Sequence, residues 1–358
     1  MTREIRRIPA AVCRLLICLA VVAAQTGAWS TSGTPARDPF EFFAPSVVVS
    51  SAERASLDRN QALTRPLAGP KGQLGVFVAT RLNAHPDAIT AWTRAIVELK
   101  RGKFVLAIGR FSDPPQVSDL DALALDDRDL ESIRRCRPGA CALKLSAAEI
   151  RTLSAAAART PDDWRVGVQQ EFRRLLVERV LQYQAAGLAE APVPADRTGA
   201  PHPQHALSAI VDASPYLTSI PEARRWLLLY PRADASVESF FYWSKEHYGE
   251  GKPVISVTHV GIVRSRADHR LPTVLVLGKQ ILATHYIEGG LGLTTIVRDS
   301  TTGTAYLAYL NRSQVDFLRG WFGGLMRGML EDRLEREAPL IVRSLRERLE
   351  SGAPSEAP

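Results

Sequence analysis

The chain has 358 residues, a formal net charge of +7 and 46% apolar residues. These values exclude an intrinsically disordered chain, a collagen-like fibre and a multi-pass membrane protein. Only four cysteines are present, which also excludes a small scaffold held together by disulfides. A chain of this length can bury one large core or two smaller ones.

The first 24 residues have the pattern of a secretory signal peptide. Arg3, Arg6 and Arg7 precede an apolar run over residues 15–24, and small residues follow. The run is shorter than the roughly 20 residues that span a bilayer, so we predict a cleaved signal; an uncleaved anchor is the alternative. We therefore expect a periplasmic or secreted protein. Without this segment the net charge is +4, which argues against nucleic acid as a partner.

Two cysteines, Cys136 and Cys141, lie beyond this segment, with the turn sequence Arg137-Pro138-Gly139 between them. In an oxidising compartment such a pair closes a small loop, so we predict a structural disulfide. A redox pair is the alternative, although the spacing is not Cys-x-x-Cys. The chain near the pair offers no second Cys/His pair for zinc, and we expect neither a metal nor a cofactor.

Composition shifts suggest how the chain is organised. Prolines 192, 194, 201 and 203 favour an exposed connector, and the stretch before residue 71 is rich in Ser, Thr, Pro and Ala. The predicted parts are a flexible leader (25–70), a mixed α/β and helical part that contributes to the sheet (71–190), a linker (191–204), a C-terminal sheet with a long helix (205–350) and a disordered tail (351–358).

The N-terminal part begins with a predicted strand, helix and strand. The apolar run 74–80 suits a strand, His85-Pro86-Asp87 opens a helix that ends at Gly102, and residues 104–108 return as a strand. The acidic stretch that follows lacks the residue order of a calcium loop, so we predict a short helix over 126–134. A longer helix is predicted over residues 163–186.

The C-terminal part is dense in β-branched and aromatic residues and predicts an antiparallel meander. The predicted strands are 236–246, 254–263, 274–287, 291–298 and 305–310, and the predicted turns are 249–251, 267–269, 289–290 and 301–303.

A long helix is predicted over residues 314–349, capped by Ser313 with Asp316 three positions on. Pro339 should kink it. Gly320, Gly324 and Gly328 recur at four-residue steps; we expect them to permit close packing on the sheet, and an open pocket side is the alternative. Its predicted apolar stripe comprises Val315, Leu318, Phe322, Leu325, Met329, Leu334, Ile341, Leu345 and Leu349.

This order of elements resembles the helix-grip arrangement of START-like (SRPBCC) lipid-binding domains. The resemblance lies in strand 74–80, the helix after His85, strands 236–310 and helix 314–349, about two thirds of the mature chain. Residues 113–203 depart from it. In that family a curved sheet wraps the helix around an apolar cavity, so the resemblance implies a similar cavity here. We expect an α+β fold with a curved antiparallel sheet covered by the C-terminal helix, plus a mostly helical segment.

Strand alternation suggests a site for the polar part of a ligand. It places His259 with Ile255, Val257 and Val263 on one apolar face, and His285 with Lys279 among apolar residues of the next strand. Two histidines in such positions could meet and orient a ligand head group. The alternative is that each is a core residue with its own hydrogen bonds. The other candidate ligand-binding residues are Tyr286, Glu246, Glu288, Trp243 and Phe322.

We therefore expect an exported protein that binds an apolar or amphipathic small molecule without catalysis, since no complete catalytic motif is present. Transient contact with a membrane surface is compatible with this role. One alternative is a periplasmic hydrolase or cyclase that uses His259, His285 and a carboxylate. The other is a structural or interaction protein with a filled core.

Overall fold

A computed structural model describes residues 38–354, apart from 86, 160–162, 233–236, 248–250, 266–270 and 321–322. The predicted signal peptide, the turn at 267–269 and the candidate ligand-binding residue Phe322 lie outside the described residues.

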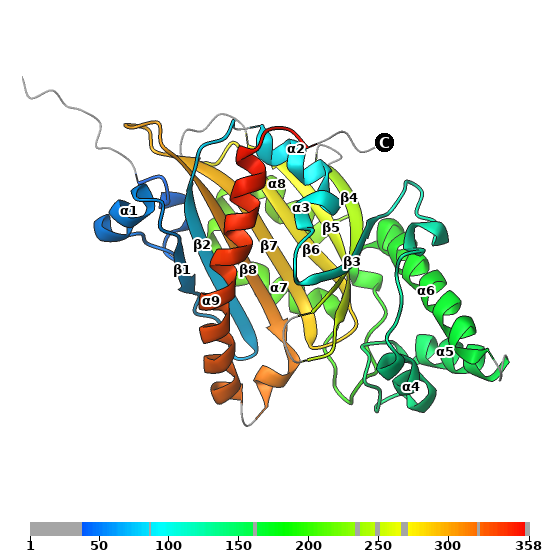
Figure 1. The fold of residues 1–358 in the computed structure, drawn as a ribbon. Coiled ribbons are helices and arrows are strands. Elements are labelled where there is room, and N and C mark those ends of the chain that lie inside the picture. The colour runs from blue at the N-terminus through cyan, green and yellow to red at the C-terminus, as the bar shows by residue number, and fades with distance from the viewer. Residues whose placement is uncertain are drawn as a thin grey trace, which may run out of the picture. The chain divides into compact units, whose positions relative to one another are not determined.

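The described residues form one antiparallel sheet in the strand order β1-β2-β8-β7-β6-β5-β4-β3 (Figure 1). From β4 to β8 each strand pairs with the next, which confirms the predicted meander and the α+β class. The strands are β1 (Leu63–Pro66), β2 (Gln73–Leu82), β3 (Val105–Arg110), β4 (Glu238–Glu246), β5 (Val254–Arg264), β6 (Val274–Ala283), β7 (Ile287–Arg298) and β8 (Ala305–Val315).

Strands β2 and β3 lie far apart in the sheet although they are close in sequence. β2 pairs with β8 along its whole length, whereas β3 pairs with β4 at the opposite edge. The segment between them must cross the sheet, and it carries α2 (Ala88–Arg94) and α3 (Ile96–Lys100) over one face. The single helix predicted here is interrupted at Ala95.

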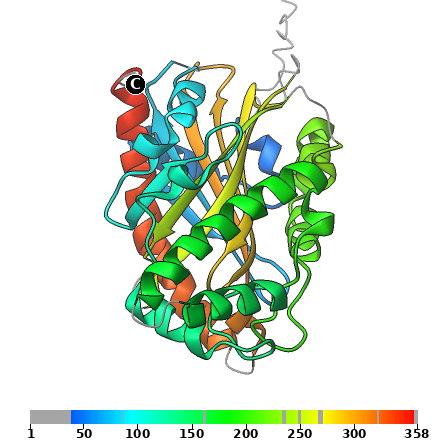
Figure 2. The same ribbon diagram turned by 90° about the vertical axis from the view of Figure 1, so that its right-hand side faces the viewer.

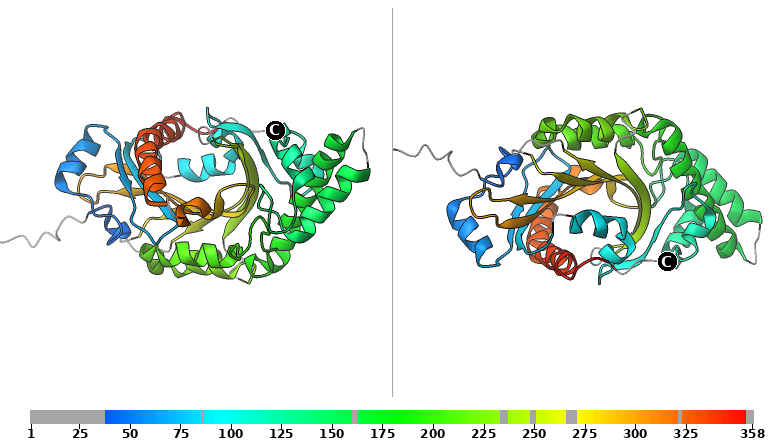
Figure 3. Two further views of the ribbon diagram at one scale, coloured as in Figure 1. Left: turned by 90° about the horizontal axis from the view of Figure 1, so that it is seen from below. Right: turned by 90° about the horizontal axis from the view of Figure 1, so that it is seen from above.

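The C-terminal helix starts later than predicted. β8 continues to Val315 because Ser313 pairs with Leu74 of β2, so the predicted cap at Ser313 is wrong. A short 3-10 helix, η5 (Asp316–Arg319), precedes α9 (Gly323–Glu350), which packs against β1 and β2 and contains Pro339. We call this side of the sheet the α9 face (Figure 3).

Only part of the predicted apolar stripe of α9 faces the sheet. Leu349 of the predicted stripe is buried, together with Ala338 and Val342, which the prediction did not include, and with Trp92 and Leu82. We call this contact the α2–α9 cluster. The predicted stripe is wrong for three of its members, which are exposed: Leu325, Met329 and Ile341.

Helices of the long β3–β4 connection cover the opposite face, which we call the helical face. The helix α6 runs across it in Figure 2, and α7 packs on β7. Side chains of sheet and helices share one core, and residues 37–358 form a single unit. This connection contains η2 (Val117–Leu120), α4 (Asp127–Arg135), α5 (Ala147–Arg159), α6 (Trp164–Ala186), η3 (Leu188–Glu190), α7 (Pro203–Asp212), η4 (Pro215–Ser219) and α8 (Pro221–Leu229).

The described part of the predicted leader differs from the extended chain we expected. It contains η1 (Glu41–Phe43), α1 (Ser51–Asp58) and β1. Phe40 and Phe43 are fully buried against Phe77 of β2, with ring centroids 6.2 and 5.2 Å away. Burial of these rings offsets the cost of ordering the segment.

The predicted turn at Gly289-Gly290 is also wrong, because both residues pair with β8 inside β7. The chain turns instead before β7, where Tyr286 has a φ of 59°. A Cβ on Gly289 would lie 3.1 Å from Cβ of Ala206 on α7. Glycine here therefore permits a close helix–sheet contact. Among the described residues, no helix combines the length and apolar character needed to cross a membrane.

Gly324 and Gly328 of α9 do not serve close packing, contrary to expectation. A Cβ on Gly324 or Gly328 would meet nothing within 4 Å, and both residues are exposed. Exposed glycines inside a helix cost about 1 kcal/mol each relative to alanine.

We predict that Gly324→Ala and Gly328→Ala each raise the free energy of unfolding by up to about 1 kcal/mol, measured by urea denaturation. The matched control is Gly323→Ala, whose Cβ would lie 2.2 Å from the carbonyl oxygen of Leu318 and should destabilise the protein. Equal effects of the three substitutions would contradict this assignment.

Candidate functional site

Two of the candidate residues, His259 and Lys279, meet in a closed aromatic box on the helical face. They pair directly across β5 and β6. Lys279 Nζ lies 4.5 Å from the ring centroid of Trp226 and 5.3 Å from those of Tyr183 and Tyr230. Such distances are typical of cation–π contacts. The alternation of β5 therefore placed His259 on the apolar face that the structure shows.

Burial in the aromatic box disfavours a positive charge on Lys279 and on His259. Lys279 Nζ donates to the carbonyl oxygens of Trp226 and Leu227, each at 3.1 Å, and burial lowers its pKa to about 7. Burial, with a smaller contribution from Lys279, also lowers the pKa of His259 well below 6.5. His259 Nδ1 shares a 3.0 Å hydrogen bond with the Tyr183 hydroxyl, and its Nε2 has no described partner. Both residues are fully enclosed.

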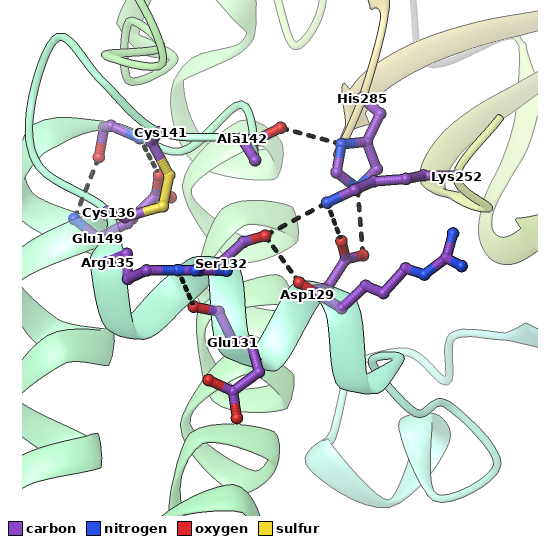
Figure 4. Close-up of a disulfide and its surroundings, with 12 residues drawn as sticks. Asp129, Glu131, Ser132, Arg135, Cys136, Cys141, Ala142, Glu149, Lys252 and His285 are labelled. Atoms are coloured by element: carbon purple, nitrogen blue, oxygen red, sulfur yellow. Dashed lines mark hydrogen bonds and ion pairs between the residues drawn. A yellow bond between two sulfur atoms is a disulfide. The ribbon is translucent and has the colours of Figure 1, made fainter.

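His285 lies in a different cluster, beside the helical segment (Figure 4). Its Nδ1 donates to the carbonyl oxygen of Ala142 at 3.0 Å, and its Nε2 lies 3.1 Å from the Asp129 carboxylate. Lys252 Nζ contacts the other carboxylate oxygen of Asp129 at 3.0 Å. Both ring nitrogens of His285 therefore face oxygen acceptors. The structure does not bring His259 and His285 together.

Asp129 is the centre of this cluster and is 3% exposed. Burial acts to raise its pKa, but the hydrogen bonds and charges of His285 and Lys252 prevail and lower it below 3.8. The predicted disulfide between Cys136 and Cys141 is present. It joins the end of α4, which carries Asp129, to the residue before Ala142, so it fixes both contacts of His285 (Figure 4).

Glu288 belongs to a third group of charges at the start of β7. Its buried carboxylate pairs with Arg197 and with Arg319. Nearby, Lys144 pairs with Asp196 at 3.3 Å and with Asp316 at 2.7 Å. A cavity of about 30 Å³ lies among some of these residues, which is room for about one water molecule. This group therefore forms a balanced ion-pair network.

Of the remaining candidates, Trp243 and Tyr286 have structural contacts. Trp243 is 1% exposed and its Nε1 donates to the carbonyl oxygen of Asp119 at 2.8 Å. The Tyr286 hydroxyl accepts from the backbone N–H of Lys252 at 3.0 Å. Glu246 differs from both, because it points to the α9 face.

The middle of the α9 face is partly exposed, although it lies at the centre of the sheet. On the other face of the same strands Leu277, Leu293 and Leu310 are fully buried. The helix α9 packs over β1 and β2, and α2 meets it only at one end of the sheet (Figure 1). The residues left between them, which we call the open strip, are Val276, Gly278, Gln280, Gly292, Thr294, Tyr309, Asn311 and Ser313.

A polar cluster borders the open strip. Lys100, at the end of α3, contacts the Glu246 carboxylate at 2.6 Å and the Tyr242 hydroxyl at 3.2 Å, and the Ser244 hydroxyl donates to Glu246. We call this the Lys100–Glu246 cluster. Burial raises the pKa of Tyr309, Lys100 opposes this rise, and Tyr242 and Glu246 add to it. Tyr309 therefore connects the strip to the cluster.

The sequence reasoning missed Lys100, Tyr309 and Asn311. For Tyr309 and Asn311 the signal is alternation: along β8, Leu307, Tyr309 and Asn311 change from apolar to polar on one face. A cavity of about 590 Å³ lies at the C-terminal end of α9 rather than beneath residues 314–330. Within the described residues, no group of three or more His, Cys, Asp or Glu side chains could hold a metal ion.

Comparisons with known proteins give one distant structural similarity to report. No protein-family model and no curated protein matches the chain. A solved structure, the di-domain ARO/CYC StfQ from the steffimycin biosynthetic pathway, matches with 15% identity and a TM-score of 0.22. The match covers 38% of this chain and 44% of that chain. No conclusion about activity follows from a similarity of this size.

We predict that Lys279→Met flattens the pH dependence of stability. The pKa of Lys279 is about 7 in the folded protein and 10.5 when exposed, so the unfolded chain binds one more proton between these values. Stability should therefore rise with pH across this window, by at most about 1.4 kcal/mol per unit, and Lys279→Met should remove the rise. Urea denaturation at several pH values measures it; the exposed Lys71→Met is the control. A slope that survives in Lys279→Met would contradict this.

We also predict that Asp129→Asn lowers the free energy of unfolding by about 3 kcal/mol, because it leaves His285 and Lys252 without their buried carboxylate. The control is Asp127→Asn on the same helix, whose side chain is 85% exposed and whose effect should stay within about 0.5 kcal/mol. Denaturation of both variants, with the disulfide intact, gives the comparison. Equal losses would show that Asp129 has no special part.

Proposed function

We propose that this protein binds a small amphipathic molecule on the open strip, with the polar part of the ligand at the Lys100–Glu246 cluster. The observation that supports this most is the partial exposure of side chains at the centre of an eight-stranded sheet. A core face left open in this way is characteristic of a ligand site rather than of packing.

The chemistry of the strip favours an amphipathic ligand. Its polar groups are uncharged hydroxyls and amides, which can orient a ligand through hydrogen bonds. Gly278 and Gly292 lie side by side across β6 and β7 and leave a flat floor. A Cβ on Gly292 would find its nearest neighbour, Asn311, at 3.9 Å. Apolar groups can lie against this floor while Tyr309 and the Lys100–Glu246 cluster accept or donate hydrogen bonds.

Binding without catalysis fits the placement of the histidines. A hydrolase or cyclase built on His259, His285 and a carboxylate requires them to converge at an accessible point. His259 is enclosed by aromatic rings and His285 is held between Asp129 and Ala142, and both are nearly inaccessible. An interaction protein with a filled core is supported less well, because side chains of the strip are partly exposed.

We expect the protein to bind 11-(dansylamino)undecanoic acid, a fluorescent amphipathic probe, with one molecule per chain. Gly292→Leu places a side chain on the strip and should weaken binding at least tenfold, measured by fluorescence titration. The matched control is Gly324→Leu, which adds the same side chain to the outer face of α9 and should leave the affinity unchanged.

Native mass spectrometry of the protein purified from its own host gives an independent readout, since a bound lipid-sized molecule would appear as added mass. Absence of both probe binding and added mass would refute the proposal. So would a Gly292→Leu variant that is folded, judged by its denaturation curve, and binds as tightly as the original protein.

A further inference from the structure

A second candidate site, different in chemistry from the open strip, lies at the C-terminal end of α9. Its cavity has a volume of about 590 Å³, within the range of small-molecule sites. Four segments form it: the turn after α1, the end of β2 with the residues after it, the β7–β8 hairpin and the last turns of α9. The α2–α9 cluster, with Leu82 and Leu349 at its core, lies between this end of the molecule and the open strip.

Positive charge predominates in the lining. Arg81 from β2, Arg298 from the hairpin and Arg346 from α9 face the cavity, against the single carboxylate of Glu350. That carboxylate accepts hydrogen bonds from Arg346 Nε at 3.0 Å and from the backbone N–H of Asn83 at 2.8 Å. The lining therefore carries a net charge of two positive units and attracts anions.

The guanidinium groups are held in place and retain donors. Arg81 Nη1 donates to the carbonyl oxygen of Asp58 at 3.0 Å, and Arg298 Nη1 donates to that of Gly303 at 3.4 Å. Each guanidinium has five N–H donors in a planar fork, so one such contact orients the group and leaves others for a ligand. Asp299, on the same hairpin, pairs with Arg54 instead.

Neutral donors complete the lining. Thr302 and Thr304 contribute hydroxyls, and Asn60 and Asn83 contribute amides. Arginine forks together with hydroxyl and amide donors match the several oxygens of a tetrahedral oxyanion. We propose that this cavity binds a small molecule through a phosphate or sulfate group. This site is separate from the one proposed above and does not depend on it.

Isothermal titration calorimetry tests this with inorganic phosphate and glycerol 3-phosphate, with glycerol as the neutral control. We expect both anions to bind, glycerol not to bind, and affinity to fall as sodium chloride is raised. The variant Arg298→Gln with Arg346→Gln should weaken binding at least tenfold. Arg343→Gln removes an exposed arginine of α9 outside the cavity and should have no effect.

Vesicles distinguish a lipid headgroup from a free phosphate ester. Co-sedimentation with phosphatidylglycerol but not phosphatidylcholine vesicles, abolished by the double variant, would identify a membrane lipid as the source. Should the double variant fail to fold, Arg298→Gln alone, on the exposed hairpin, replaces it. The proposal fails if neither anion nor vesicle binds, or if Arg343→Gln weakens binding as much as the cavity variants.

Discussion

The pairing of β2 with β8 is the constraint on which the rest of the structure depends. It joins residues 73–82 to residues 305–315 through a ladder of ten pairs. Strand β2 can therefore join the sheet only when β8 is present. Since α9 follows β8 directly, this pairing also places the helix over β1 and β2. The chain between β2 and β3 must then cross the remaining strands to reach the far edge. Together these two requirements leave the centre of the α9 face only partly covered.

The helical face is organised by a different interaction. The long β3–β4 connection leaves the edge of the sheet and returns to it, and its helices bury their apolar sides on the sheet. The ion pair of Asp129 with His285 and Lys252 fastens α4 to the turn before β7 and to the segment before β5. The disulfide beside it joins the end of α4, the helix that carries Asp129, to the residue before Ala142, the other partner of the histidine. The charged contacts and the disulfide therefore both stabilise the junction between α4 and the sheet.

Much of the fold could be predicted from local patterns. Alternation of apolar residues gave β5 with bounds close to those observed, and the turn residues 301–303 mark the β7–β8 hairpin. The errors occur where a local signal competes with a distant partner. Ser313 looks like a helix cap but pairs with Leu74 of β2, far away in sequence. Gly289 looks like part of a turn but pairs with Gln314 of the following strand. No local pattern records which strands will be neighbours.

The candidate sites show the same contrast between what local patterns predict and what depends on distant partners. The facing of His259 and Lys279 followed from strand alternation, whereas the partners of His285, Asp129 and Ala142, lie more than a hundred residues earlier in the chain. Tyr309, Lys100 and Glu246 meet only because β8, α3 and β4 border one face. The arginines of the cavity at the end of α9 come from three separate elements. Such groups follow from topology, and topology was the part of the fold that the sequence left undetermined.

The contacts around the α2–α9 cluster have a consequence for access to the open strip. The indole of Trp92 donates to the carbonyl oxygen of Gly352, and Arg348 contacts the carbonyl oxygens of Leu99 and Arg101. These contacts close the α9 face at the end where α2 and α3 meet α9. A ligand on the open strip, as proposed above, would therefore have to approach Tyr309 from the side of the strip away from these contacts.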